Sequence, residues 1–179
     1  MEPSPPEPAL APWQGPQETL GGSLSARPRG IAAPEFVLLD RDGGEFGRMV
    51  MHGPEGARLD AGSLRARIER VASPARYRML TGEAETLVAY PAGSSVAMKI
   101  RCAGRPYEAA FYLLRNTAAA APVGDGETAR LTGGVLTRRY QVLFDTGDGR
   151  SLPIALFLLY YTVTLRRRAF LTGSTVARR

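Results

Sequence analysis

The chain has very few of the side chains on which metal, nucleophilic or disulfide chemistry usually depends. Among its 179 residues there is one cysteine, Cys102, and one histidine, His52. A single cysteine excludes an internal disulfide and is compatible with a reducing compartment. We expect Cys102 to be a buried strand residue, and His52, which precedes Gly53 and Pro54, to lie at a solvated strand end. A catalytic dyad or triad needs a positioned base and an orienting partner, which the sequence does not place beside either residue.

Motifs for nucleotide binding and for export are missing as well. No glycine-rich phosphate loop of the GxGxxG or GxxxxGK[ST] type occurs. The first residues, MEPSPPEPALAPW, contain neither the basic nor the apolar segment of a secretory signal, so the cytoplasm is the expected location. We expect no cofactor, no metal ion and no enzymatic activity.

Lysine is nearly absent, and arginine carries the positive charge. Lys99 is the only lysine among the 23 basic residues, and the formal net charge is +6. A bias toward arginine, alanine, glycine and proline can arise from genome composition, so the net charge alone is weak evidence for nucleic acid. The distribution is more informative, because the segment 150–179 contains six arginines and no acidic residue. Such a segment suits an anionic surface.

Acidic residues gather around two Asp-Gly turns. One group is Asp40, Asp42 and Glu45, and the other is Asp145 and Asp148. Aspartate is common in turns because its carboxylate accepts hydrogen bonds from nearby backbone N–H groups. Neither group has the ligand loop of an EF-hand, so we interpret both as turns and not as calcium sites.

Composition divides the chain into a leader and one domain. Residues 1–34 hold eight of the 14 prolines and few large apolar residues, which predicts a disordered leader with Trp13 exposed. Residues 35–179 form the predicted domain. Its short apolar segments are separated by turn residues, which predicts a mainly β fold, a barrel of about 10–12 antiparallel strands. The segment 64–71, LRARIERV, stays open between a strand and an amphipathic helical turn.

The uncharged run 152–165, LPIALFLLYYTVTL, organises the fold prediction. Ser151 before the run and Pro153 in its first turn are typical of a helix start, and the three arginines at 166–168 suit the negative end of a helix dipole. Such a helix would rise about 21 Å at about 1.5 Å per residue, whereas the hydrocarbon core of a bilayer is about 30 Å thick. We therefore predict a hydrophobic helix at about 151–166, enclosed by the barrel. A strand, favoured by the β-rich YYTVTL, and a membrane anchor are the alternatives.

Two groups of arginines are candidate binding residues for lipid headgroups or other anions. Strand alternation places two pairs of arginines on one face each, and three further arginines follow the apolar run. The candidates are Arg65, Arg67, Arg76, Arg78, Arg166, Arg167 and Arg168. An ordinary solvated sheet face is the simpler interpretation of the strand arginines. Because aromatic residues do not interleave with them as a stacking platform would require, anionic lipid ranks above nucleic acid as a partner.

Three segments follow an order that is found in a known superfamily. FVLLDRDGGEFGRMV would be an opening hairpin, TGGVLTRRYQVLF a late strand pair, and DTGDGRSLPIALFLLYYT the approach to the helix. In pattern and order, over about residues 35–168, the chain resembles the tubby C-terminal-like superfamily, which includes the LURP-one-related proteins and the phospholipid scramblases. The resemblance implies a closed β-barrel that wraps a hydrophobic C-terminal helix.

The resemblance implies less about ligands. The tubby proteins proper bind phosphoinositide through a basic pocket, and the pattern of this sequence does not place that pocket residue by residue. The scramblases carry an acidic segment before the helix that is proposed to bind calcium. Asp145 and Asp148 fall there, but they supply far fewer than the roughly six to eight oxygen ligands that calcium takes. The resemblance therefore implies a fold, and fold alone does not determine function.

Taken together, these features predict a cytoplasmic, non-enzymatic binding or scaffold module of the tubby or LURP-one type. Its expected partners are anionic membrane lipid, to which it would be peripheral, or another protein. One alternative is a protein anchored in the membrane by 152–165. A second is a small enzyme with its site at the barrel mouth, although no convergent set of titratable residues supports it.

Overall fold

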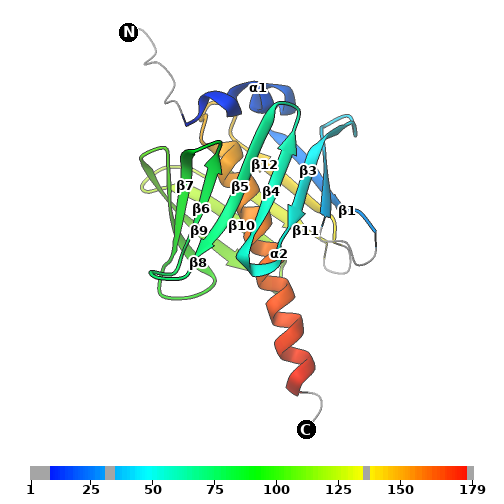
Figure 1. The fold of residues 1–179 in the computed structure, drawn as a ribbon, viewed down its shortest axis with the longest axis vertical. Coiled ribbons are helices and arrows are strands. Elements are labelled where there is room, and N and C mark those ends of the chain that lie inside the picture. The colour runs from blue at the N-terminus through cyan, green and yellow to red at the C-terminus, as the bar shows by residue number, and fades with distance from the viewer. Residues whose placement is uncertain (1–8, 31–34, 135–137, 177–179) are drawn as a thin grey trace.

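In a computed structural model, which describes residues 9–30, 35–134 and 138–176, the chain forms a closed antiparallel barrel around its C-terminal helix (Figure 1). Side chains are described as far as Ala169. The elements are, in order, α1 Ala11–Leu20, β1 Ser23–Pro28, β2 Glu35–Leu39, β3 Glu45–Met51, the 3-10 turn η1 Gly53–Glu55, β4 Gly56–Ala61, β5 Leu64–Val71, β6 Arg76–Thr81, β7 Ala84–Pro91, β8 Ala97–Cys102, β9 Arg105–Tyr112, β10 Thr117–Pro122, β11 Ala129–Gly133, β12 Tyr140–Phe144 and α2 Ser151–Val176.

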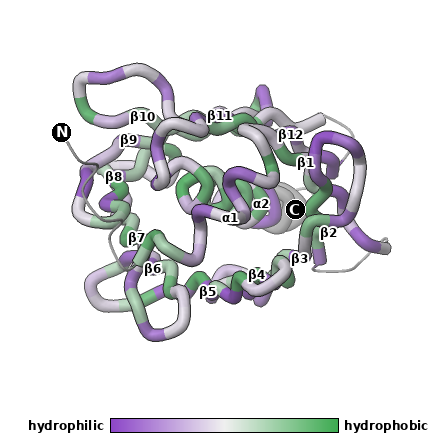
Figure 2. The backbone as a smooth tube through the Cα atoms, turned by 90° about the horizontal axis from the view of Figure 1, so that it is seen from above, coloured by the Kyte–Doolittle hydropathy of each residue, from purple (hydrophilic) through white to green (hydrophobic). Residues whose placement is uncertain are grey.

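The barrel is a meander in which each strand pairs with the strand before it. β1 closes the ring, since Ser25 pairs with Gln141 of β12 on one side and with Leu39 of β2 on the other. Seen from above, the strands surround α2, and α1 lies over the opening (Figure 2). Closure pairs both edges of every described strand, which removes the edges on which other chains can add. The prediction of about 10–12 antiparallel strands is confirmed by the twelve that the structure describes.

Alternation of apolar and polar residues decides which side of each strand faces inward. In β5, Leu64, Ala66 and Ile68 are buried, whereas Arg65 and Arg67 between them are exposed. This period of two is that of a strand with one buried face. The segment LRARIERV is therefore a strand and not a helical turn.

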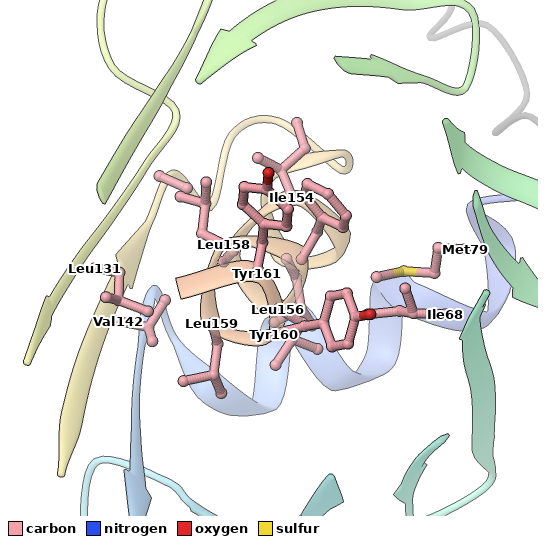
Figure 3. Close-up of a cluster of buried hydrophobic side chains, with 14 of the residues drawn as sticks. Ile68, Met79, Leu131, Val142, Ile154, Leu156, Leu158, Leu159, Tyr160 and Tyr161 are labelled. Atoms are coloured by element: carbon pink, nitrogen blue, oxygen red, sulfur yellow. The ribbon is translucent and has the colours of Figure 1, made fainter. Parts of the chain in front are cut away.

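The interior of the barrel is filled by the first half of α2. All side chains from Ser151 to Leu165 are buried. They meet inward-facing residues of opposite walls, with Ile68 and Met79 on one side of the helix and Leu131 and Val142 on the other (Figure 3). A helix that is apolar on every side is stable in water only when it is surrounded. The predicted buried helix is confirmed, and the strand alternative for 152–165 is wrong.

Tyrosines fasten the last buried turn of α2 to the barrel. The ring of Tyr77 lies edge-on to that of Tyr161, with 5.3 Å between the ring centroids. The Tyr160 hydroxyl donates to the carbonyl oxygen of Pro54 at 3.1 Å, and the Tyr161 hydroxyl donates to that of Ser95 at 3.0 Å. These residues bury an apolar ring and still satisfy a polar hydroxyl. The side chains thus hold the helix at a defined depth.

Alkaline pH should destabilise the fold through its buried tyrosines. Burial raises the pKa values of Tyr160 and Tyr161 above the ordinary value of 10.0, and the positive charge of Arg168 opposes this rise only in part. Because the folded chain keeps these phenols protonated where the unfolded chain releases the protons, their contribution is complete below about pH 10 and is lost as the pH rises further. Urea-unfolding midpoints should fall above about pH 10, and less steeply in the double variant Tyr160→Phe/Tyr161→Phe. Equal slopes for both proteins would contradict this role.

The prediction of a disordered leader is wrong for residues 9–30. α1 packs on the end of the barrel, and Trp13, which we expected to be exposed, is 0% exposed. Its Nε1 donates to Thr81 Oγ1 at 3.0 Å. The domain therefore includes α1 and β1 and does not begin at residue 35. The segments 1–8 and 31–34 of the predicted leader lie outside the described residues.

β1 shows why composition misled the prediction. The strand has only six residues, but its pattern places Leu24 and Ala26 inward, at 1% and 0% exposure. A segment rich in proline and glycine lacks enough apolar area to order by itself. The rest of the barrel supplies what the segment lacks. It offers β2 and β12 as pairing partners and a core into which Leu24 and Ala26 pack. The order of this segment is thus a tertiary effect.

α2 is longer than predicted. It continues past the expected end at residue 166 to Val176, and in Figure 1 this continuation projects beyond the strands. The helix therefore has an enclosed part that forms the core and a part outside the barrel. The three arginines at 166–168 lie where the first part gives way to the second.

Candidate functional site

The two ends of the barrel carry opposite charge. In a meander, every second connection lies at the same end, and the α1 end, uppermost in Figure 1, contains the turns after β2, β4, β6, β8, β10 and β12. Arg41 and Arg150 are the basic residues of these turns. The acidic residues of these turns are Asp40, Asp42, Glu83, Asp125, Glu127, Asp145 and Asp148. The α1 end is therefore negatively charged.

The opposite end, at which α2 leaves the barrel, is called the exit end. It is formed by the connections after β1, β3, β5, β7, β9 and β11. Among the described residues of these connections, Glu55 is the only acidic one. Glu35, at the start of β2, also lies there and pairs with Arg29 at 3.6 Å. The basic residues of the exit end are Arg29, Arg115, Arg138 and Arg139 in the connections and Arg166, Arg167 and Arg168 on α2.

Large apolar side chains are exposed at the exit end. Leu114 projects from the connection between β9 and β10, and Arg115 follows it directly. The exposed fractions at this end are 38% for Tyr90, 39% for Val96, 54% for Tyr112 and 97% for Leu114. Two others, Val123 and Leu143, lie toward the α1 end. An exposed leucine at a loop tip beside arginines is suited to the interface of an anionic bilayer.

Three of the predicted binding arginines lie away from this end and are already paired. Arg65 Nε is 3.1 Å from Asp60 Oδ1, and Arg67 Nε is 2.7 Å from Glu69 Oε1. Arg78 Nη2 is 2.9 Å from the other oxygen of Glu69. These are exposed ion pairs, each of which contributes little to stability. Two carboxylates serve them, because Glu69 is shared by Arg67 and Arg78 and Asp60 also pairs with Arg58 at 2.8 Å. An anion at this face would have to compete with these carboxylates for the three guanidinium groups.

The remaining predicted arginines lie at the exit end, where each is partly buried. Arg166 Nη1 donates to Tyr140 Oη at 3.5 Å. Burial raises the pKa of Tyr161, and the positive charges of Arg168 and Arg70 partly offset that rise. Arg76, at the start of β6, and Arg166, Arg167 and Arg168 on α2 thus lie at the exit end, whereas Arg65, Arg67 and Arg78 lie within β5 and β6 and are paired with carboxylates.

Sequence reasoning missed Leu114, Arg115 and Arg139 as part of this end. Each lies in a connection between two strands, far along the chain from 166–168. The signal that could have found them is the meander itself. When each strand pairs with the next, every second turn falls at one end, and LLRN together with Arg138 and Arg139 then lies with the end of the apolar helix.

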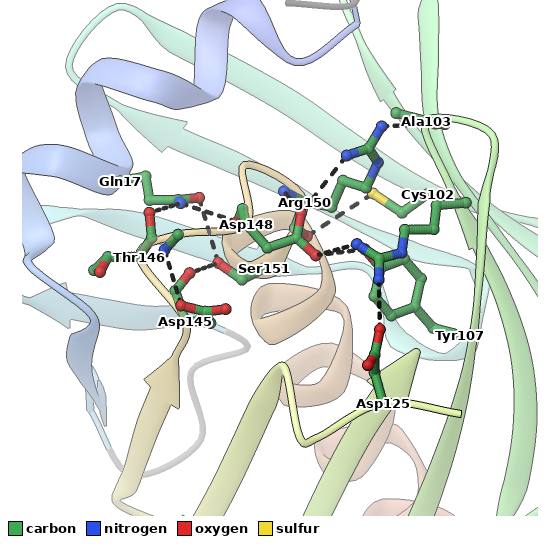
Figure 4. Close-up of polar contacts among 12 residues, drawn as sticks. Gln17, Cys102, Ala103, Tyr107, Asp125, Asp145, Thr146, Asp148, Arg150 and Ser151 are labelled. Carbon is green, nitrogen blue, oxygen red and sulfur yellow. Dashed lines mark hydrogen bonds and ion pairs between the residues drawn. The ribbon is translucent and has the colours of Figure 1, made fainter. Parts of the chain in front are cut away.

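Polar residues at the α1 end hold the turn that leads into α2 (Figure 4). Asp148 accepts hydrogen bonds from Tyr107 Oη at 2.6 Å and from the backbone N–H of Arg150 at 3.0 Å. Gln17 of α1 donates its amide to the carbonyl oxygens of Thr146 and Asp148 at 3.2 and 3.0 Å. Burial and the bond to Asp148 raise the pKa of Tyr107. These contacts fasten α1 and the start of α2 together, which is a structural role.

The interpretation of the acidic groups as turns is confirmed. Asp40 Oδ1 accepts from the backbone N–H groups of Asp42 and Gly44 at 3.0 and 2.7 Å. Asp145 Oδ1 accepts from Gly147 N at 2.8 Å. Within the part of the chain that the structure describes, no three His, Cys, Asp or Glu side chains converge as metal ligands would.

Cys102 and His52 lie where the sequence predicted. Cys102 is buried at the end of β8, with its Sγ 3.9 Å from the carbonyl oxygen of Arg150. His52 is exposed directly after β3. The first is at the α1 end and the second at the exit end, so they form no dyad.

Known proteins match this chain in fold and not in sequence. No family model and no curated protein matches it. The fold is similar to the solved structure of a protein from Arabidopsis thaliana, with a TM-score of 0.58 and 11% sequence identity, over 87% of this chain and 97% of that chain. A likeness at this identity shows a shared barrel architecture.

Proposed function

We propose that the chain is a non-enzymatic binding module whose exit end docks on an anionic phospholipid surface. The observation that best supports this is the segregation of charge, with acidic turns at the α1 end and arginines at the exit end. A negatively charged surface attracts one end of such a barrel and repels the other, so the molecule approaches in a single orientation. The projecting part of α2 would then point toward the surface.

Leu114 adds a short-range component to this contact. Moving a leucine side chain from water into an apolar environment contributes about 1.5–3 kcal/mol. Arg115 beside it can keep its guanidinium among the headgroups while its aliphatic stem follows the leucine. Electrostatic attraction would bring the exit end to the membrane surface, and burial of the Leu114 side chain would slow its dissociation.

Membership of the tubby C-terminal-like superfamily is part of the proposal. A closed barrel around an apolar C-terminal helix is what the sequence resemblance implies, and the Arabidopsis protein of similar fold is a plant protein of the LURP-one/tubby-like fold family. The order of the three similar segments also supports this placement. The proposed lipid contact does not follow from the likeness, because it rests on the residues of the exit end.

The anchoring alternative makes a different structural demand. Leu152 to Leu165 are buried in the barrel, so the barrel would have to release this helix before it could meet lipid. Among the described helices, none combines the length and the apolar character needed to cross a membrane. Docking by the exit end requires no such release. The predicted cytoplasmic location and the predicted protein partner stay predictions.

Replacing Arg166, Arg167 and Arg168 together by glutamine should strongly weaken binding to anionic vesicles. Each arginine near such a surface contributes about 1 kcal/mol, so three correspond to roughly a hundredfold weaker partitioning. The attraction extends over about 8 Å at physiological salt, and binding should therefore fall steeply as salt rises. Co-sedimentation with vesicles of phosphatidylglycerol in phosphatidylcholine measures both effects, and pure phosphatidylcholine should bind little.

The matched control is the triple variant Arg65→Gln/Arg67→Gln/Arg78→Gln. It removes the same formal charge from the paired face of β5 and β6, and we expect nearly unchanged vesicle binding. Equal losses in the two triple variants would show that only net charge matters and would reject docking by the exit end. Binding that survives high salt would instead favour insertion of the apolar segment, because salt does not weaken hydrophobic burial.

A further inference from the structure

A groove on the outer face of the barrel joins β1, β11 and β12 near the exit end. Its volume is about 400 Å³, and its polar lining comes from Ser25, Arg27, Thr132, Arg139 and Gln141. No carboxylate is among its described lining residues. The sequence between Glu127 and Asp145 also contains no acidic residue. The groove is therefore positively charged and rich in hydrogen-bond donors.

Two arginines, Arg27 and Arg139, line this groove from its two sides. Ser25 pairs with Gln141 and Ala26 with Tyr140, so the same antiparallel register, continued by one position, places Arg27 opposite Arg139. On the other side of Arg139 the neighbour is Gly134, whose N–H donates to the Arg139 carbonyl oxygen at 3.1 Å. Gly134 also lines the groove and has no side chain to fill it.

This arrangement is unfavourable without an anion. Like charges directly opposite each other on neighbouring strands destabilise a sheet. Other arginines of the barrel have acidic neighbours, as in the pair of Arg130 and Glu127 at 2.8 Å. Within the described residues, neither Arg27 nor Arg139 forms an ion pair with a carboxylate. Both side chains are exposed and therefore accessible to a ligand.

Three uncharged polar residues, Ser25, Gln141 and Thr132, line the groove beside the two arginines. Gln141 lies between Ser25 and Thr132 in the sheet register. Ser25 Oγ donates to Gln141 Oε1 at 3.0 Å, which turns the amide so that its two N–H donors are available. Thr132 is exposed and its hydroxyl can donate as well. Guanidinium, amide and hydroxyl groups are the donors that recognise phosphate oxygens.

We propose that this groove binds a phosphate group carried by a monoester or as inorganic phosphate, with Arg27 and Arg139 on either side of it. A phosphomonoester loses its second proton with a pKa of about 6 and is nearly a dianion at neutral pH. Two facing guanidinium groups match that charge, and its terminal oxygens can each accept a bond from the guanidinium forks. The groove can take up this group from solution or from a lipid headgroup, so the proposal does not depend on the docking proposed above.

Titration of the full chain with inorganic phosphate and with glycerol 3-phosphate, at constant ionic strength in chloride, tests the site. Arg27→Gln and Arg139→Gln should each weaken saturable binding by about tenfold or more, as expected for the loss of charge-assisted hydrogen bonds. The matched control is Arg101→Gln, which removes an exposed arginine from the outer face of β8. The melting temperatures of both groove variants without phosphate should equal or exceed that of the unaltered chain, because each change relieves a like-charge contact.

A second arm distinguishes a free phosphate from a lipid headgroup. Vesicles with phosphatidate, a monoester, are compared with phosphatidylglycerol vesicles, a diester, at equal surface charge. If the source is a lipid, Arg27→Gln weakens binding to phosphatidate and leaves binding to phosphatidylglycerol unchanged. If the phosphate group comes from a soluble molecule, Arg27→Gln weakens binding in the titration with inorganic phosphate or glycerol 3-phosphate. The proposal is overturned if the groove variants bind phosphate and phosphatidate vesicles as strongly as Arg101→Gln does. Weaker binding of the variant at 166–168 to phosphatidylglycerol vesicles tests only docking by the exit end.

Discussion

Replacing Leu156 by aspartate should abolish folding. Leu156 is 0% exposed at the centre of the barrel, where a carboxylate would have no cation within reach and could not keep its hydration. Burying an unpaired charge costs several kcal/mol, which is a large part of a typical folding stability of about 5–15 kcal/mol. We expect insoluble protein, or soluble protein without a cooperative thermal transition in circular dichroism.

Leu114→Asp is the matched control, because it makes the same chemical change at a side chain that is 97% exposed. The melting temperature of this variant should stay close to that of the unaltered chain. A normally folded Leu156→Asp variant would mean that α2 does not form the core, and the anchoring alternative would then gain support.

Deletion of residues 1–34 should also prevent folding. The deletion removes β1, which pairs with β12 and β2, and would leave two long unpaired edges in place of a closed ring. It also removes Trp13 and Leu24 from the core. Loss of a buried tryptophan side chain alone costs about 3–5 kcal/mol. We expect the shortened chain to aggregate through its open edges, which size-exclusion chromatography and circular dichroism would detect.

A finer variant separates the contributions of packing and hydrogen bonding at α1. Trp13→Phe keeps an aromatic ring in the core and removes the bond from Nε1 to Thr81, so it should cost only about 1 kcal/mol for the bond plus a smaller packing loss. If the chain without residues 1–34 melts at the temperature of the full chain, closure by β1 is wrong and the leader is dispensable.

The barrel and its helix were predictable because their signals are local. In β5 the alternation of leucine, alanine and isoleucine with arginine specifies both a strand and its inner face. The run 152–165 is too apolar for an exposed helix and too short for a comfortable membrane span. These two facts together require an enclosing wall, which the strands provide.

The leader and the exit end could not be predicted in the same way. Trp13 looked exposed because nothing within its own segment could bury it, and its partner Thr81 lies far along the chain. The strand arginines looked like a binding face because their carboxylate partners depend on strand register. Asp60, for example, faces Arg65 only once β4 and β5 are paired.

The amino-acid sequence alone predicted the class of fold, favoured a buried helix over the strand and anchor alternatives, and placed the acidic residues in turns, Cys102 in a buried strand and His52 at a strand end. These follow from the preferences of neighbouring residues and from the cost of exposing apolar side chains or burying polar ones. Only the tertiary structure decided that α1 and β1 belong to the barrel, that acidic turns gather at one end and arginines at the other, and that Arg27 and Arg139 line one groove. Each of these depends on strand order and register, which bring residues from distant parts of the chain together.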